Sequence, residues 1–157
     1  MRHIFIMLLA ALPYVSRAQD VFDAVMNSAQ TVIANPDADE SMLAMAQFKV
    51  TALRYLNRKA VEKEMTFRQM DIQAYYMSEF LSAYTRTLTK TYATNKKDVK
   101  KAVFKYMSAS AENPLFGDQD KQTTLVFVED DSSLTPFSLD TDWQKAYEQL
   151  FPSEAAK

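Results

Sequence analysis

The chain has 157 residues, a formal net charge of −2, one histidine, one glycine and no cysteine. A mildly acidic chain lacks the excess of lysine and arginine that neutralises phosphates, so we do not expect a nucleic-acid partner. Without cysteine, an exported chain must be stabilised by its hydrophobic core rather than by disulfides.

The N-terminal residues have the pattern of a secretory signal peptide. A basic start at Arg2 is followed by an apolar run over residues 4–15 and by small residues that suit cleavage after Ala18. The run has 12 residues, whereas a membrane-spanning helix needs about 20. We therefore predict a signal peptide over residues 1–18, no transmembrane segment after its removal, and a periplasmic or secreted protein.

Residues 19–157 form one predicted domain. Cleavage after Ala18 leaves 139 residues and removes His3, so the mature chain has neither histidine nor cysteine. That composition excludes Ser-His-Asp triads, Cys-His pairs and histidine-based zinc or iron sites. Gly117 is the only glycine, so no glycine-rich loop can hold a phosphate or a dinucleotide. We assign no catalytic, cofactor-binding or metal-ligating residue and expect no cofactor.

The scarcity of glycine and proline favours helices, because hairpins usually need tight turns. The first predicted helix covers residues 21–34, with Asp20 as its N-cap and Asn35-Pro36 as its stop. The second covers residues 39–64. Its apolar stripe consists of Met42, Ala46, Leu53, Leu56 and Ala60, opposite Gln47, Thr51, Arg54 and Arg58.

Lys49 is the ionisable residue that falls inside this apolar stripe, between Met45 and Leu53. A buried lysine needs a carboxylate partner or has a lowered pKa, and either can mark a functional site. The simpler interpretation is that its stem packs while its ammonium group reaches water.

The third helix carries the most regular pattern in the chain. It opens with Thr66 and Gln69, a capping-box pair. Its apolar residues recur at alternating spacings of four and three, as expected for antiparallel bundle packing. This seam consists of Met70, Ala74, Met77, Leu81, Tyr84 and Leu88.

Asp71, Tyr75 and Glu79 project from the other side of the third helix. The two carboxylates are separated by about 12 Å of helix rise, whereas glycosidase pairs stand about 5 to 9.5 Å apart. Two interpretations remain open: an outer polar row, or a ligand-binding face with an exposed tyrosine.

The fourth predicted helix covers residues 96–111 and begins beside Asn95 and Asp98. Its apolar side consists of Val99, Ala102, Val103 and Tyr106. Five lysines occupy the rest of the helix, which we interpret as a solvated face: Lys96, Lys97, Lys100, Lys101 and Lys105.

The composition of the sequence changes after Pro114. Residues 123–128 have the β-branched composition of a strand, but the candidate partner, residues 134–139, contains Pro136. We therefore predict a short helix or an extended packing segment instead. A terminal helix follows, capped by Thr141 and Gln144. Its apolar side consists of Trp143, Ala146, Tyr147 and Leu150.

Two acidic groups in this segment resemble cation sites. Asp118, Asp120 and Glu129 match three ligand positions of an EF-hand loop, but Thr123 stands where that loop needs glycine, so we do not predict calcium binding. The second group combines Glu129, Asp130 and Asp131 with Asp140 and Asp142. We interpret Asp140 as a helix N-cap.

Three stretches resemble segments of small exported helical proteins from Bacteroidota. They are AMAQFKVTALRYL (residues 44–56), DIQAYYMSEFLSAY (residues 71–84) and TPFSLDTDWQKAY (residues 135–147). The resemblance implies an exported all-helical domain. It transfers no catalytic residue, because no activity is attached to that family.

The sequence thus predicts an all-α, single-domain bundle of four to five helices, with an irregular acidic C-terminal segment and a short terminal helix. We expect an exported, non-enzymatic binding or structural module whose partner is an unknown protein or envelope component. Two alternatives stay open: a periplasmic hydrolase that uses carboxylates and tyrosine, and a cation-dependent surface protein. A cleft joining Asp71, Tyr75, Arg54 and Lys49 would favour the hydrolase.

Overall fold

The computed structural model describes residues 20–92, 95–117, 123–127 and 134–152. The predicted signal peptide lies outside these residues. The elements are α1 (Asp20–Ala34), α2 (Glu40–Val61), α3 (Phe67–Tyr92), α4 (Lys96–Glu112), β1 (Thr123–Phe127), β2 (Leu134–Ser138) and α5 (Trp143–Leu150). The predicted helical single-domain bundle is confirmed. No described helix has both the length and the apolarity needed to cross a membrane.

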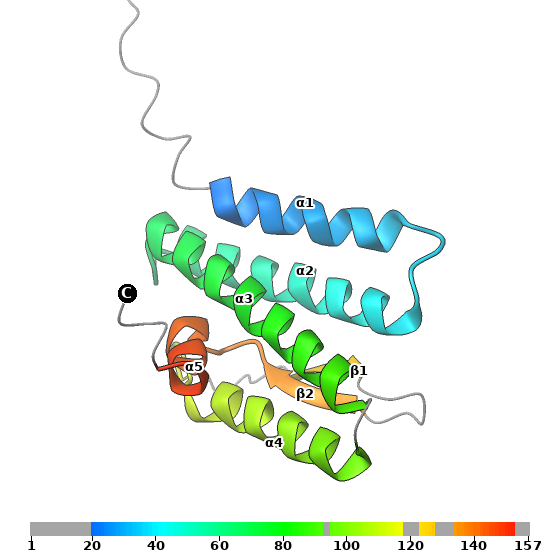
Figure 1. Cartoon of the computed structure of the whole chain (residues 1–157). Coiled ribbons are helices and arrows are strands. Elements are labelled where there is room, and N and C mark those ends of the chain that lie inside the picture. The colour runs from blue at the N-terminus through cyan, green and yellow to red at the C-terminus, as the bar shows by residue number, and fades with distance from the viewer. Residues whose placement is uncertain (1–19, 93–94, 118–122, 128–133, 153–157) are drawn as a thin grey trace, which may run out of the picture.

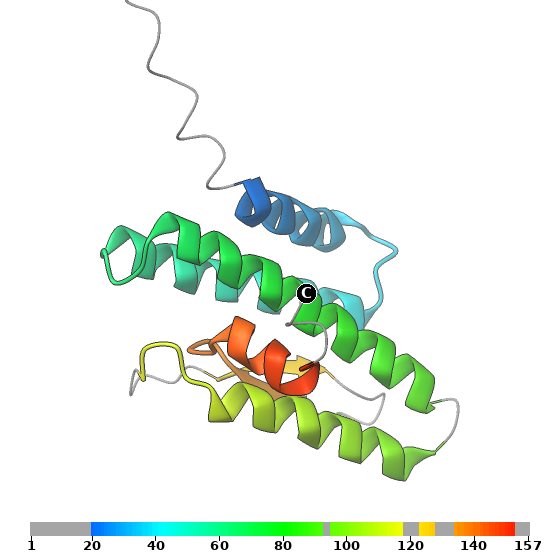
Figure 2. The ribbon, with the colours of Figure 1, turned by 60° about the vertical axis from the view of Figure 1, so that its left-hand side comes forward.

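The bundle is built around the pair α2 and α3. Helix α1 packs on one side of this pair, and α4 lies on the opposite side (Figure 1). Helix α5 lies between α3 and α4 and contacts both, and the hairpin of β1 and β2 is inserted between α2 and α4 (Figure 2). The C-terminal segment is therefore an integral part of the bundle and not an appendage.

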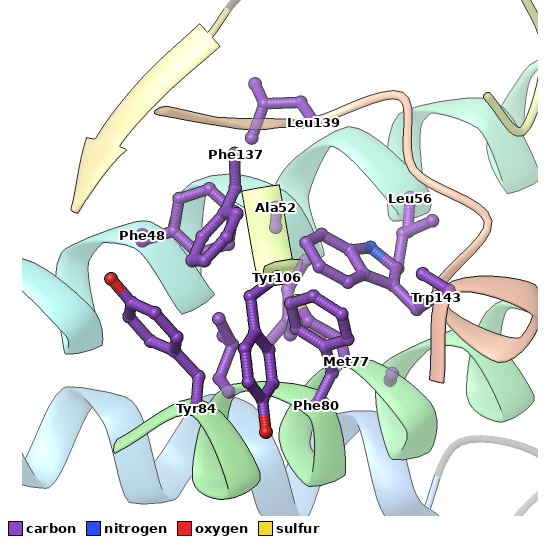
Figure 3. Packing of buried hydrophobic residues seen from close by; sticks show 14 of the residues in the cluster. Phe48, Ala52, Leu56, Met77, Phe80, Tyr84, Tyr106, Phe137, Leu139 and Trp143 are labelled. Atoms are coloured by element: carbon purple, nitrogen blue, oxygen red, sulfur yellow. The ribbon is translucent and has the colours of Figure 1, made fainter. Parts of the chain in front are cut away.

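Aromatic side chains from five elements meet in the core (Figure 3). Phe80 of α3 makes edge-to-face contacts with Phe137 of β2 and Trp143 of α5, at centroid distances of 5.6 and 5.4 Å. Phe48 of α2 contacts the same two rings, and Tyr106 of α4 packs against Phe80 at 5.2 Å. Such pairs add about 0.5 to 1.5 kcal/mol each beyond the burial of their area.

The predicted seam of α3 is buried throughout. Its residues Met70, Ala74, Met77, Leu81, Tyr84 and Leu88 all lie in the core. The predicted capping box is also present, because the backbone N–H of Thr66 donates to Gln69 and the N–H of Gln69 donates to the hydroxyl of Thr66. Local sequence signals thus determine both the start of α3 and its orientation.

The prediction for residues 123–128 is wrong, because β1 pairs with β2 in an antiparallel hairpin. Pro136 stands opposite Leu125 in this register. In a sheet of two strands, each strand has one edge that forms no ladder hydrogen bonds, and proline is tolerated where its nitrogen faces such an edge. Pro136 is therefore compatible with a strand at this position.

Three smaller predictions also need correction. The N-cap of α5 is Asp142, whose carboxylate accepts from the N–H of Lys145, and not Thr141. Asp140 is not a helix cap but a buried acceptor. Met42, which the periodicity predicts in the buried stripe of α2, is 47% exposed, because it belongs to the first turn of that helix, beyond the main core. The five lysines of α4 are exposed, as predicted.

Candidate binding face on helices α3 and α5

Gln73 of α3 anchors the N-terminus of α5. Its amide nitrogen donates to a carboxylate oxygen of Asp142 at 3.0 Å, and its amide oxygen accepts from the backbone N–H of Trp143 at 2.7 Å. All three residues are buried. Because a helix leaves its first N–H groups without internal partners, Gln73 both satisfies one of these groups, that of Trp143, and fixes the position of α5 against α3.

Asp140 forms a second buried anchor just before α5. One carboxylate oxygen accepts from the hydroxyl of Tyr55 at 3.2 Å and from the backbone N–H of Phe116 at 2.7 Å. Close by, the ammonium group of Lys59 lies 4.8 Å from the ring centroid of Phe116 and 3.0 Å from a carboxylate oxygen of Glu64. These contacts tie the chain between α4 and α5 to helix α2.

A groove of about 520 Å³ lies beside these anchors, between the start of α3, helix α5 and the segment at Leu115 and Phe116. Its polar lining consists of Glu64, Gln69, Gln73, Asp142, Gln144, Lys145 and Glu148. Two of its carboxylates already have partners: Glu64 pairs with Lys59, and Asp142 pairs with Gln73 and Lys145. Glu148 accepts from the amide of Gln144. The groove therefore presents mainly amides and oriented acids.

A row of four aromatic rings runs next to the groove, across both helices. Tyr75 contacts Tyr76 at 5.2 Å, Tyr76 contacts Tyr147 at 5.7 Å, and Tyr147 contacts Phe151 at 4.8 Å. Tyr75 is 49% exposed and the other three are partly buried. We call these four residues the aromatic row. Ile72 of the groove precedes Tyr75 by one helical turn, so groove and row form one continuous face.

The structure gives the predicted outer row of α3 two different roles. Asp71 accepts a hydrogen bond from the backbone N–H of Phe22 at 2.8 Å, so it supports the N-terminal turn of α1. Asp20, which the sequence predicted as the N-cap of that helix, lies within α1. Tyr75 opens the aromatic row, and Glu79 is half-buried.

The structure does not assemble the cleft that would favour a hydrolase. Lys49 lines a separate pocket, together with residues of α1 and Thr85. Arg54 is exposed on another side of α2, and neither this pocket nor the groove contains Asp71, Tyr75 or Arg54. Burial lowers the pKa of the Lys49 ammonium group.

Of the acidic residues that resemble cation sites, the structure describes Asp140 and Asp142. The candidate ligands at positions 118, 120 and 129–131 lie outside the described residues. Asp140 and Asp142 bind donors of the protein itself. Within the part of the chain that the structure describes, no three acidic side chains are grouped so that they could hold a metal ion.

Comparison of the chain with protein-family models, curated proteins and solved structures finds no match. The functional interpretation of this face therefore depends on its geometry alone. Sequence reasoning missed both Gln73 and the aromatic row, whose halves are about 70 residues apart. The spacing of Tyr147 and Phe151 by four residues was the one local signal, because such pairs meet on a helix surface.

Proposed function

We propose that this protein is an exported, non-enzymatic binding module that holds a basic segment of a protein partner on the face formed by α3 and α5. The aromatic row is the observation that carries the proposal. Four rings in mutual contact reach the surface beside a groove of about 520 Å³. Tyrosine is enriched at protein interfaces and among the residues that dominate binding energy, because its ring is large, rigid and has a polar end.

The charge of the face supports a basic partner. Acidic side chains outnumber basic ones in the groove, where Glu64, Asp142 and Glu148 stand against one basic residue, Lys145. Arginine and lysine also bind favourably over tyrosine rings, at about 0.5 to 1 kcal/mol where the site is exposed. A partner of this kind should therefore bind more weakly as salt rises.

The state of the groove's carboxylates favours binding over hydrolysis. A glycosidase-type reaction needs one carboxyl group to donate a proton and a second to act as base or nucleophile. In the groove, the carboxylates of Glu64 and Asp142 already form ion pairs with Lys59 and Lys145. The hydrolase and the cation-dependent surface protein stay as alternatives that the experiments below can distinguish.

Selection from a random peptide library displayed on phage would test the proposed partner. We expect the purified domain to select peptides enriched in arginine and lysine, and Tyr75→Ala to weaken their binding about tenfold. Tyr75 contacts Tyr76 at the edge of the row and is half exposed, so this change should leave the fold intact. Phe104→Ala is the matched control, because Phe104 is an exposed aromatic residue of α4 that takes no part in the row.

Equal binding by the wild type and Tyr75→Ala would refute the role of the row. A screen of peptidoglycan fragments and divalent cations by thermal shift should give no saturable response. A saturable response to glycans that Tyr75→Ala abolishes would replace the protein partner by a carbohydrate. A response to calcium would favour the cation-dependent alternative.

Export is the part of the proposal that rests on sequence alone, since residues 1–19 lie outside the described residues. The resemblance to exported proteins of Bacteroidota stays a prediction as well. Mass spectrometry of the protein from its native envelope should find Gln19 at the N-terminus. An intact Met1 in a membrane fraction would contradict cleavage after Ala18.

A further inference from the structure

A second, smaller pocket lies between α1, the N-terminal part of α2 and α3. Its volume is about 170 Å³, and it includes Lys49 from α2, Thr85 from α3, and residues from the second half of α1 and the first turns of α2. A cavity of about 150 Å³ is large enough to hold benzene. The pocket therefore suits a ligand of similar size, much smaller than any segment that fits the face on α3 and α5.

Lys49 gives this pocket its chemical character. It is the only charged side chain among the described residues that line the pocket. No carboxylate of the described residues forms an ion pair with it. Burial of its ammonium group lowers its pKa, so the charged form is poorly solvated here. An anion that entered the pocket would relieve this cost by pairing with Lys49.

The hydroxyl groups of the pocket complement an anion in the same place. Ser28 and Ser41 are exposed and stand at the mouth. Each can donate one hydrogen bond, because a serine hydroxyl carries one donor and two acceptor sites. The hydroxyl of Thr85 donates to the carbonyl of Leu81 at 3.0 Å and so offers only its lone pairs, which suit the Lys49 ammonium group. The lining thus combines one cation, Lys49, with the hydroxyl donors of Ser28 and Ser41.

The rest of the lining is apolar and adaptable. Met42, Met45 and Val32 line the pocket together with the small buried side chains of Ala29 and Ala46. Methionine fills irregular spaces because it is unbranched and polarizable. An inorganic anion has no apolar part to pack against these apolar side chains, and a metal cation would be repelled by the ammonium group of Lys49. A short organic acid satisfies both parts of the pocket.

We infer that this pocket binds a small monocarboxylate with a short apolar tail, with Lys49 as its counter-charge. The site borders a small buried cluster of Ala29, Ala46 and Val50, which Met26 connects to the main core. Helix α1 lies on the outer side of the bundle (Figure 1), so a ligand here would fasten α1 to α2 without disturbing the aromatic core. This inference does not depend on the proposed function of the face on α3 and α5.

Titration with butyrate and benzoate tests the inference, followed by the methyl NMR signals of Met42 and Met45. We expect both signals to shift saturably with benzoate, and not with benzamide or with sodium chloride at equal ionic strength. Lys49→Met keeps the length of the stem but removes the charge, and should weaken benzoate binding about tenfold or more. Lys49→Arg should retain most of the affinity.

The matched control is Lys101→Met, which removes a lysine from the exposed face of α4 and should not change the affinity. Lys49→Met should fold at least as well as the wild type, since it removes a desolvated charge, so a loss of binding would not reflect unfolding. Undiminished benzoate binding by Lys49→Met would overturn the inference, as would the absence of any saturable shift in the wild type. Equal binding of benzamide would show a merely apolar pocket and would refute the role of the charge.

Discussion

Replacement of Gln73 by alanine should loosen the attachment of α5 to the bundle. The change removes the donor to the Asp142 carboxylate and leaves the buried N–H of Trp143 without its partner. A hydrogen bond to a charged group contributes about 1.5 to 3 kcal/mol, and an unsatisfied buried donor costs about 1 to 3 kcal/mol. Because contributions that share one side chain are not additive, we expect the free energy of unfolding to fall by about 2 to 4 kcal/mol.

Urea denaturation followed by tryptophan fluorescence measures this loss directly. Trp143 is the only tryptophan, is fully buried and begins α5, so its emission reports on the docking of that helix. Far-UV circular dichroism of the same samples reports on the whole bundle. If Gln73→Ala frees α5 before the bundle unfolds, the fluorescence transition will occur at lower urea than the circular dichroism transition.

Two further variants separate hydrogen bonding from the filling of space. Gln73→Met fills a similar volume without either polar group, so it should be nearly as destabilising as Gln73→Ala. Gln47→Ala removes an exposed amide of α2 and should change stability by less than about 0.5 kcal/mol. If Gln73→Met recovered most of the lost stability, the cost would come from the cavity and the reasoning from hydrogen bonds would fail.

Three other predictions concern single positions. Leu81→Ala should cost about 2 to 5 kcal/mol through the cavity it leaves, whereas Glu79→Ala should cost well under 1 kcal/mol in the same urea assay; equal losses would contradict the assignment of the seam. Lys63 has a φ of 62° just after α2, a conformation in which glycine is unstrained. Lys63→Gly should therefore raise the melting temperature by the equivalent of about 0.5 to 1 kcal/mol. A decrease would show that the lysine side chain stabilises the fold by more than its backbone strain costs. Burial lowers the folded-state pKa of Lys49 below its ordinary 10.5, so between these two pKa values the unfolded chain binds more protons than the folded chain, and the stability of the wild type should rise with pH there. The stability advantage of Lys49→Met over the wild type should therefore shrink as pH rises through that window. An advantage that did not change with pH would refute this explanation.

The helices were predictable because their apolar residues recur with the period of a helix and their first turns carry capping residues. The seam of α3 from Met70 to Leu88 is the clearest example, since both the spacing and the Thr66 cap are local signals. The tests of Leu81 and Glu79 rely on that same periodicity. Local patterns of this kind indicate which side of a helix faces the core, and the packing of the other helices decides how far along the helix burial extends, as the exposed Met42 shows.

The C-terminal segment was harder to predict, because its structure depends on contacts with distant residues. Asp140 and Asp142 follow each other closely in an acidic stretch, and nothing near them shows that Tyr55 and Gln73 will provide their donors. The hairpin was missed for a related reason, since Pro136 is acceptable only in a sheet that ends at its own strand. Sequence distance limited the prediction for the two acids, whereas Pro136 misled the prediction for the hairpin.

The anchor at Gln73 also connects stability with the proposed binding. Two rings of the aromatic row, those of Tyr147 and Phe151, move with α5, whereas Tyr75 and Tyr76 belong to α3. Gln73 fixes the start of α5 against α3 and thereby sets the distance between these two halves. Gln73→Ala should therefore weaken binding of a selected basic peptide at temperatures where the bundle is still folded.

The pocket at Lys49 provides a control within the same molecule. It is built from α1, α2 and Thr85 and shares no residue with α5. In Gln73→Ala, benzoate should therefore bind as it does to the wild type while the basic peptide binds more weakly. If both affinities fell together, the variant would be loosened throughout, and the weaker peptide binding could not be attributed to the position of α5. If neither affinity fell, peptide binding would not require Gln73 to hold the two halves of the aromatic row at a fixed distance. Tyr75 and Tyr76 alone would then have to account for peptide binding.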